Sequence, residues 1–218
     1  MNIAEIYCER GNLEEAESIL RGSLRVWRAS GYRYFIADCL KYLGRVLTRA
    51  MRFDEALGMF DTALELFADV GAEEERVEVM VRTAECQVFM GHAEEALKTM
   101  ELVRAKMAGT EVASSMLPLV FRTEGYALAQ LGRFDSATVA FGESLERARA
   151  RGEDLEVALA LHGSIRLAEL TGADIPMELR AERDAIFGRL GVESPAEIPL
   201  EVPASEPTIG RPVKAARS

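Results

Sequence analysis

The chain has few cysteines, few aromatic residues and no excess of basic charge. Its three cysteines, Cys8, Cys39 and Cys86, lie far apart and form no CxxC pair, which argues against a disulfide framework or a zinc site. Aromatic residues make up 7% of the 218 residues while alanine is abundant, a balance that favours helix over sheet. The net charge of −10 counts against duplex nucleic acid and against an anionic membrane surface as partners.

Long apolar runs are also absent. The first twenty residues carry glutamates throughout and no apolar block, so no secretory signal is visible. The longest apolar stretches, such as "VALAL" at 157–161, fall far short of the roughly 20 residues that a membrane span needs. These absences predict a soluble, cytoplasmic protein.

Catalytic and phosphate-binding motifs are missing as well. His92 and His162 lie far apart in the chain, without the HExxH spacing of a zinc site. No GxxxxGK[ST] or GxGxxG loop occurs, and "HGSIR" at 162–166 lacks the second glycine of a nucleophile elbow. The sequence therefore predicts that the protein is not an enzyme and needs neither a cofactor nor a metal.

What the chain does contain is a repeated pattern. Four alanines recur at spacings of 40, 40 and 41 residues: Ala16, Ala56, Ala96 and Ala137. Twelve residues before each stands a small residue, and four residues after each stands a large apolar residue. The small residues are Ala4, Gly44, Ala84 and Gly125, and the large ones are Leu20, Phe60, Met100 and Phe141. A period of this size, with matched small and large positions, marks a stacked repeat architecture.

Glycines punctuate the repeat at two phases. One phase carries Gly11, Gly91, Gly132 and Gly172, with Met51 once in place of glycine, and the other carries Gly31, Gly71, Gly109 and Gly152. Glycine just past a helix end accommodates left-handed backbone. Within 40–51, apolar residues recur at steps of three and four, which puts a stripe on one helix face. Each unit is thus predicted to be two helices of roughly 15–18 residues joined by tight turns.

The segment "LKYLGRVLTRAMRFDEALGMFDTAL", residues 40–64, resembles a tetratricopeptide repeat (TPR). The matching elements are Leu43-Gly44, Leu47, Phe53, Ala56, Phe60 and Ala63. The resemblance covers about residues 1–172 and implies an all-α, right-handed solenoid of stacked antiparallel helix pairs, with about 4.5–5 repeats. The unit exceeds the family's usual length of about 34 residues and lacks its terminal proline. It is similar to the long-repeat variety found in bacterial signalling proteins.

The chain is expected to change character near residue 191. A capping helix is predicted to begin with Pro176 in its first turn and to end near Leu190. From 192 onward, prolines recur every four or five residues and large apolar residues become sparse. The predicted organisation is a helical repeat domain with its capping helix over 1–191 and a Pro-rich disordered tail over 192–218.

The resemblance also implies a binding surface, because the first helix of each pair builds the concave face in this family. The matching positions carry Lys41, Tyr42, Arg45, Arg49, Arg82, Phe89, Arg122, Tyr126 and Arg166. Their basic excess predicts a protein or peptide partner with Asp or Glu beside apolar anchors. Reversing Arg82 and Arg122 is expected to abolish binding while leaving helicity intact. The asparagines of TPR domains that clamp a terminal carboxylate are not found at the matching positions.

Three functions fit these observations. The first is a protein–protein interaction module that binds a segment of its partner in a concave groove. The second is a regulatory or sensor segment of a larger signalling protein, such as a cyclase, an ATPase or a transcription regulator. The third is self-association through the uncapped N-terminal end, where Ile3 and Ile6 lie. The basic face could also be a solvated helical surface without a ligand.

Overall fold

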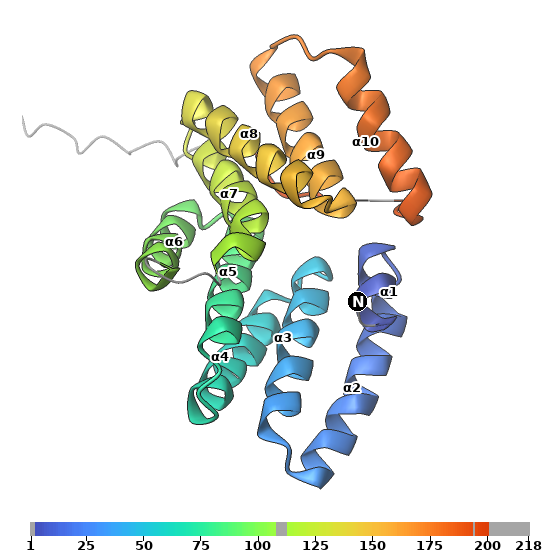
Figure 1. Ribbon diagram of the computed structural model, residues 1–218, viewed down its shortest axis with the longest axis vertical. Coiled ribbons are helices and arrows are strands. Elements are labelled where there is room, and N and C mark those ends of the chain that lie inside the picture. The colour runs from blue at the N-terminus through green and yellow to red at the C-terminus, as the bar shows by residue number, and fades with distance from the viewer. Residues whose placement is uncertain (1–2, 108–112, 194, 201–218) are drawn as a thin grey trace, which may run out of the picture.

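The computed structural model describes residues 3–107, 113–193 and 195–200. These fold into ten α-helices without a strand in the described ranges (Figure 1). The helices are α1 (Ile3–Glu9), α2 (Leu13–Ser30), α3 (Arg33–Arg49), α4 (Phe53–Asp69), α5 (Glu73–Phe89), α6 (Ala93–Met107), α7 (Ala113–Gln130), α8 (Phe134–Arg151), α9 (Asp154–Thr171) and α10 (Met177–Leu190). The expected all-α repeat solenoid is confirmed.

The turn after α3 shows what the glycine positions require. Met51 occupies this turn with φ 58°, in the left-handed region, where the other units carry glycine. Its N–H donates to the carbonyl of Thr48 at 3.0 Å, and the N–H of Arg52 donates to Leu47 at 2.9 Å. This pair of bonds satisfies carbonyls that the helix end leaves without partners. The turn geometry is therefore preserved although an L-residue in this conformation costs roughly 1–2 kcal/mol.

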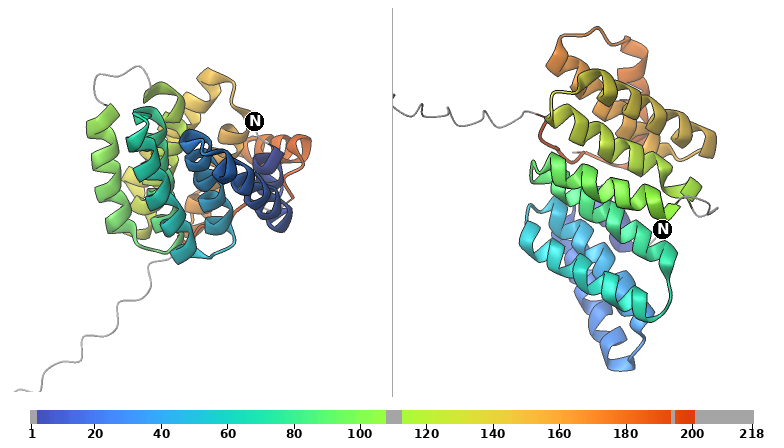
Figure 2. Two further views of the ribbon diagram at one scale, coloured as in Figure 1. Left: turned by 90° about the horizontal axis from the view of Figure 1, so that it is seen from below. Right: turned by 90° about the vertical axis from the view of Figure 1, so that its left-hand side faces the viewer.

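The odd-numbered helices form the inner layer of the stack. Successive odd-numbered helices contact one another, from α1 through α3, α5 and α7 to α9. Among the described residues, no even-numbered helix contacts another even-numbered helix. Inner helices that touch while the outer ones separate make a curved stack (Figures 1 and 2). The curvature brings the two ends together: Arg10, after α1, donates from Nε to the carbonyl of Leu190, at the end of α10, over 3.2 Å.

The matched small and large residues meet where helices cross. A Cβ on Gly44 would lie 2.4 Å from the ring of Phe60. The ring of Phe141 fills two such sites, because a Cβ on Gly125 would lie 2.8 Å from it and one on Gly163 2.4 Å. Both rings are fully buried. Glycine thus allows the backbones to approach, and the neighbouring phenylalanine fills the space, as close packing requires.

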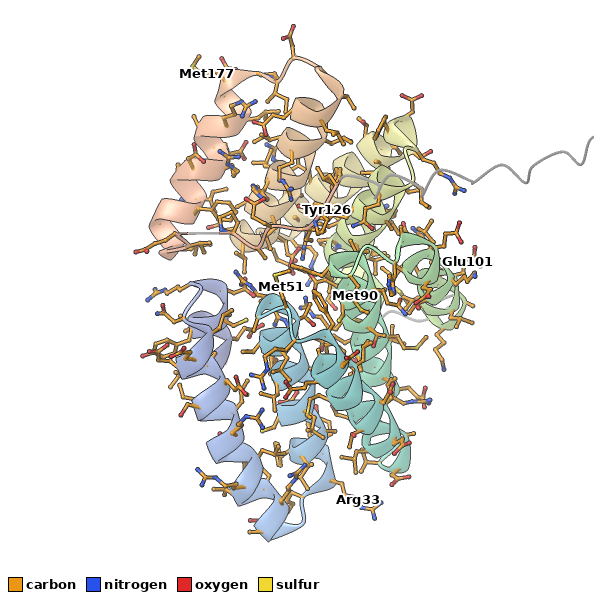
Figure 3. The ribbon with its side chains drawn as sticks, turned by 180° about the vertical axis from the view of Figure 1, so that it is seen from behind. Arg33, Met51, Met90, Glu101, Tyr126 and Met177 are labelled. Atoms are coloured by element: carbon orange, nitrogen blue, oxygen red, sulfur yellow. The ribbon has the colours of Figure 1, made fainter. Side chains whose placement is uncertain are left out.

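The buried side chains form three clusters along the stack. The first lies mainly in α1 to α5, the second in α5 to α9 and the third in α8 to α10. Tyr126 belongs to the second cluster and lies near the middle of the molecule, whereas Arg33 and Met177 lie at opposite ends (Figure 3). The second cluster also contains two residues from beyond the last helix, Ile198 and Leu200.

Residues 195–200, here called the strap, are not helical but are packed. Ile198 is 3% exposed and Leu200 is 6% exposed. These residues lie beyond the expected boundary at 191 and are buried without a helix, as alternate apolar side chains of an extended segment can be. The packed part of the chain continues to Leu200, and residues 201–218 of the expected tail lie outside the described residues.

Candidate functional site

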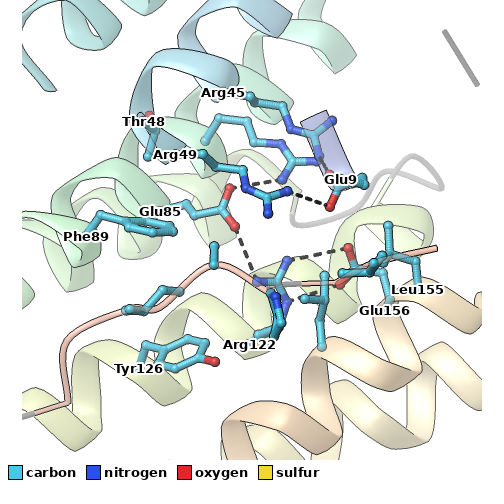
Figure 4. A pocket seen from close by; sticks show the side chains of 16 residues that line it. Glu9, Arg45, Thr48, Arg49, Glu85, Phe89, Arg122, Tyr126, Leu155 and Glu156 are labelled. Carbon is cyan, nitrogen blue, oxygen red and sulfur yellow. Dashed lines mark hydrogen bonds and ion pairs between the residues drawn. The ribbon is translucent and has the colours of Figure 1, made fainter. Parts of the chain in front are cut away.

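Most of the predicted surface residues converge on one cavity of the inner layer. Six of the nine line it: Arg45 and Arg49 from α3, Arg82 and Phe89 from α5, and Arg122 and Tyr126 from α7 (Figure 4). Helix α9 adds Leu155, Glu156 and Leu159, and the strap adds Pro195, Ala196 and Ile198. We call this surface, with the neighbouring Gln130 and Arg166, the concave groove. Its position agrees with the expectation that first helices build the concave face.

At the N-terminal end of the groove, arginines of α3 bind carboxylates of α1. Arg45 donates to Glu5 and to Glu9, both over 2.7 Å. Arg49 adds a contact to Glu9 over 3.1 Å. The guanidinium of Arg45 is buried, which disfavours its charge, but Glu9 and Glu5 outweigh that effect and raise its pKa. These ion pairs hold α1 against α3 along the inner layer.

Lys41 is similarly compensated by carboxylates. Its Nζ lies 2.8 Å from Glu78 of α5 and 3.0 Å from Asp38, one turn earlier on α3. Burial alone would lower the pKa of Lys41, but the two carboxylates outweigh it and raise the pKa to about 12. The neighbouring Tyr42 is half-buried and lies outside the main cavity, with Lys41 Nζ 4.6 Å from its ring centroid.

A chain of ion pairs continues across the middle of the groove. Arg82 contacts Glu85 on α5 over 3.0 Å, and Arg122 of α7 contacts Glu85 over 3.3 Å and Glu156 of α9 over 3.2 Å. Burial by itself would raise the pKa of Glu85, but Arg82 and Arg122 hold it at about 2. The charges therefore cross three inner helices without a gap.

The predicted basic surface is thus internally neutralised. Five of its six basic residues pair with carboxylates from their own or an adjacent inner helix. The sequence pattern did not show that Glu5, Glu9, Asp38 and Glu78 meet these basic residues. A residue four positions along one helix is predictable, whereas a partner one repeat away depends on the curvature of the stack.

Arg166 is the exception, because the carboxylate that it contacts belongs to the strap. It donates to the carbonyl of Ile198, and its Nη2 lies 3.4 Å from Glu197. Gln130, at the end of α7, donates from Nε2 to the carbonyls of Pro199 and of Val88, each over 2.7 Å. The strap itself was missed as part of the site. The alternating apolar residues of "AEIPL" at 196–200 were the available signal.

His162 lies behind the strap, on α9. It is buried, and neither ring nitrogen has a hydrogen-bond partner among the described residues. Burial, with the nearby cations Arg166 and Arg183, lowers the pKa of His162 to about 4. The residue is therefore a neutral part of the core next to α10, where it meets the ring of Phe187 edge-on at 6.2 Å.

The rest of the described chain offers little for metal or membrane chemistry. It contains no group of three or more His, Cys, Asp or Glu that could hold a metal ion. Cys8, Cys39 and Cys86 are buried and unpaired, and burial raises the pKa of each thiol. Among the described helices, none combines the length and the apolar character needed to cross a bilayer.

Comparison with known proteins agrees with the repeat geometry. Residues 1–69 match the family model of the tetratricopeptide repeat. The Arabidopsis thaliana "Protein KINESIN LIGHT CHAIN-RELATED 3" is 28% identical over 176 residues, which cover 78% of this chain and 26% of that protein. The chain therefore spans about a quarter of the length of this relative.

Solved structures show the same fold. Two are crystal structures of Podosopora anserina kinesin light chain TPR-like repeats, one of them carrying a single substitution. They superpose with TM-scores of 0.53 and 0.54 at 18% identity, covering 86% of this chain and 92% of theirs. Together with the family match over residues 1–69 and the ten-helix stack, these structures show that the chain has a tetratricopeptide-like helical repeat fold.

Proposed function

We propose that this chain is a protein–protein interaction module that binds an extended segment of a partner in the concave groove. The observation that carries the proposal is the strap, a non-helical segment that lies in the groove with its main-chain carbonyls bound by Arg166 and Gln130. Recognition through main-chain carbonyls is suited to a peptide in extended conformation. Likeness to tetratricopeptide repeats and to a kinesin light chain-related protein supports protein binding in general.

The groove residues divide into two roles under this proposal. Lys41, Arg45, Arg49 and Arg122 hold the inner helices together through their ion pairs, and Arg82 pairs with Glu85 within α5. Phe89, Tyr126 and Arg166 face the ligand. A carboxylate of the bound segment would take the place of Glu197 at Arg166. The Glu197 side chain is 75% exposed, and its carboxylate lies 3.4 Å from Arg166. The regulatory role and self-association through the N-terminal end stay predictions.

Peptide selection tests the proposal. A displayed library of random peptides is selected on the full chain, and binding of the recovered peptides is measured by calorimetry. The same peptides are titrated into Arg166→Glu and into Arg149→Glu, a matched charge reversal on the outer helix α8. We expect affinity to fall at least about tenfold with Arg166→Glu, since a charge-assisted contact contributes about 1.5–3 kcal/mol. Peptides that lose affinity equally with both variants, or with neither, would place the binding surface elsewhere.

A further inference from the structure

The strap alternates between buried and exposed side chains. Glu197 and Pro199 are exposed, and Ile198 and Leu200 are buried in the cluster that also contains Phe89, Tyr126 and Leu167. A two-residue period is that of an extended chain with one face against a surface. Ile198 and Leu200 therefore enter the groove floor, whereas Glu197 and Pro199, which alternate with them, are exposed.

Side chains from two different helices bind two successive main-chain carbonyls of the strap. Arg166 of α9 binds the carbonyl of Ile198, and Gln130 of α7 binds that of Pro199. Gln130 also binds the carbonyl of Val88 in the last turn of α5, which accepts from the N–H of Gly91 as well. The fold thus fixes the amide of Gln130 in place, and the two contacts would accept the main chain of any extended segment.

The side chains of the strap add selectivity to this main-chain recognition. Proline at 199 offers no N–H, and its fixed φ keeps the chain extended. A residue before proline is biased to extended backbone, which is consistent with the non-helical backbone at Ile198. Glu197 lies next to Arg166. The pattern that the groove holds is an acidic residue, an aliphatic residue, proline and a second aliphatic residue.

We propose that the strap is an intramolecular stand-in for the ligand, which is a partner segment with this same acidic–aliphatic–proline–aliphatic pattern. The proposal rests on the groove being the binding site. The cavity that remains beside the strap measures about 50 Å³, which is room for a few water molecules. A partner segment therefore enters only as the strap leaves, and the strap lowers the apparent affinity for partners of the closed chain.

The test uses a labelled peptide and a chain whose strap is released. The peptide ESPAEIPL has the sequence of residues 193–200 and is titrated by fluorescence anisotropy. The released chain is full length and carries Ile198→Asp with Leu200→Asp, which places two charges where the groove floor is apolar. We expect the peptide to bind the released chain at least about tenfold more tightly than the wild type, because a blocked site reduces apparent affinity by the open fraction.

Two controls make the comparison specific. Val139→Asp with Met177→Asp adds the same charges at exposed positions, and this chain should bind the peptide as weakly as the wild type. Adding Gln130→Ala to the released chain should weaken binding again. If the released chain melts at a much lower temperature, the wild type is used instead. Excess peptide should then increase the rate of amide hydrogen exchange in the strap of the wild-type chain.

The outcomes separate this proposal from the proposed function. The proposal would be overturned if the wild type and the released chain bound the peptide equally well. It would also be overturned if neither chain bound it. If ESPAEIPL fails while selected peptides bind the released chain and lose affinity with Arg166→Glu, the groove is the binding site but the pattern is wrong. Wild-type dimers in light scattering that dissociate in the released chain would make the strap of a second copy the occupant and would also overturn the proposal.

Discussion

The two ends of the concave groove neutralise their cations in different ways. Near α1 and α3, Arg45 and Arg49 pair with carboxylates supplied by the adjacent inner helix. Near α9, Arg166 instead contacts Glu197 and a carbonyl of the strap. The helix pairs at the two ends are alike. The carboxylate that pairs with the arginine belongs to a helix at one end and to a terminal segment at the other.

This difference separates structural charge from exchangeable charge. A carboxylate on a packed helix cannot leave without separating the helices, so the ion pairs of the first half contribute to the fold. A carboxylate on a terminal segment can leave with that segment. Charge excess on a helical face is therefore poor evidence of a ligand until the partners of each cation are known.

The largest expected effect comes from removing a buried cation that joins inner helices through ion pairs. Arg122→Glu would place a third carboxylate beside Glu85 and Glu156 in a buried setting. We expect a loss of about 3–5 kcal/mol in the free energy of unfolding. Arg149→Glu, at an exposed pair with Glu182, should cost under about 1 kcal/mol. Urea denaturation followed by circular dichroism measures both.

The same burial changes what a charge-reversal experiment would show. The double reversal of Arg82 and Arg122 was expected from the sequence to remove binding and leave helicity intact. With both guanidinium groups bound to Glu85, we expect that variant to lose stability as well. An Arg122→Glu chain as stable as the wild type would contradict the assignment of structural charge.

The next effect concerns the strap. A chain ending at Gly191 lacks Ile198 and Leu200, whereas a chain ending at Leu200 keeps both. Burying an aliphatic side chain contributes about 1.5–3 kcal/mol, and ordering the strap offsets part of this, so we expect the shorter chain to be less stable by about 2–4 kcal/mol. Thermal and urea midpoints of the two chains are the measurement. Equal midpoints would mean that the strap contributes no stability and that the boundary at 191 was right.

A smaller effect tests how closely the helices pack around Phe141. Phe141 is pressed between Gly125 and Gly163, while Phe60 meets Gly44. Gly163→Ala should therefore overpack the crossing and cost about 1–3 kcal/mol. Gly142→Ala, in the same region but with open space around its Cβ, should be neutral or stabilising by about 0.5–1 kcal/mol. Matching melting temperatures for the two variants would contradict the close approach.

The smallest effect is a dependence on pH in the C-terminal half. The pKa of His162 falls from 6.5 to about 4 on folding, so the unfolded chain binds the extra proton between these values. Stability should therefore be unaffected by this group above pH 7 and should fall as pH drops below 6.5. The loss at pH 5.5 is about 1.4 kcal/mol, the equivalent of one pKa unit.

The groups around His162 set the sign of that effect. Arg166 and Arg183 oppose its protonation, and Glu197 and Glu169 favour it less strongly than burial disfavours it. His162→Gln should remove the stability change between pH 7 and 5.5, as measured by urea denaturation at each pH. His92→Gln, at the exposed histidine, should leave that change in place. An unchanged pH profile in His162→Gln would contradict the assignment.

The local pattern of the sequence predicted the helices well, as particular residues show. Gly44 and Phe60 were matched by spacing alone, and the structure places them in contact. Met51 was assigned to a glycine phase and adopts left-handed backbone there. Both results follow from periodicity, because a helix and its turn are determined by residues that are close in the chain.

The sequence by itself determined the period, the all-α class, the turns and the helix faces that form the inner layer. It could not determine what lies against that layer. The carboxylates that bind Arg45 and Arg122 come from one repeat away. The carbonyl that binds Arg166 comes from the strap, which reaches the groove only because the stack is curved. Local periodicity encodes each helix pair, but contacts between distant segments depend on the summed rotation of all the repeats. The tertiary structure alone therefore decided which charges support the fold and that the chain's own strap lies in its groove.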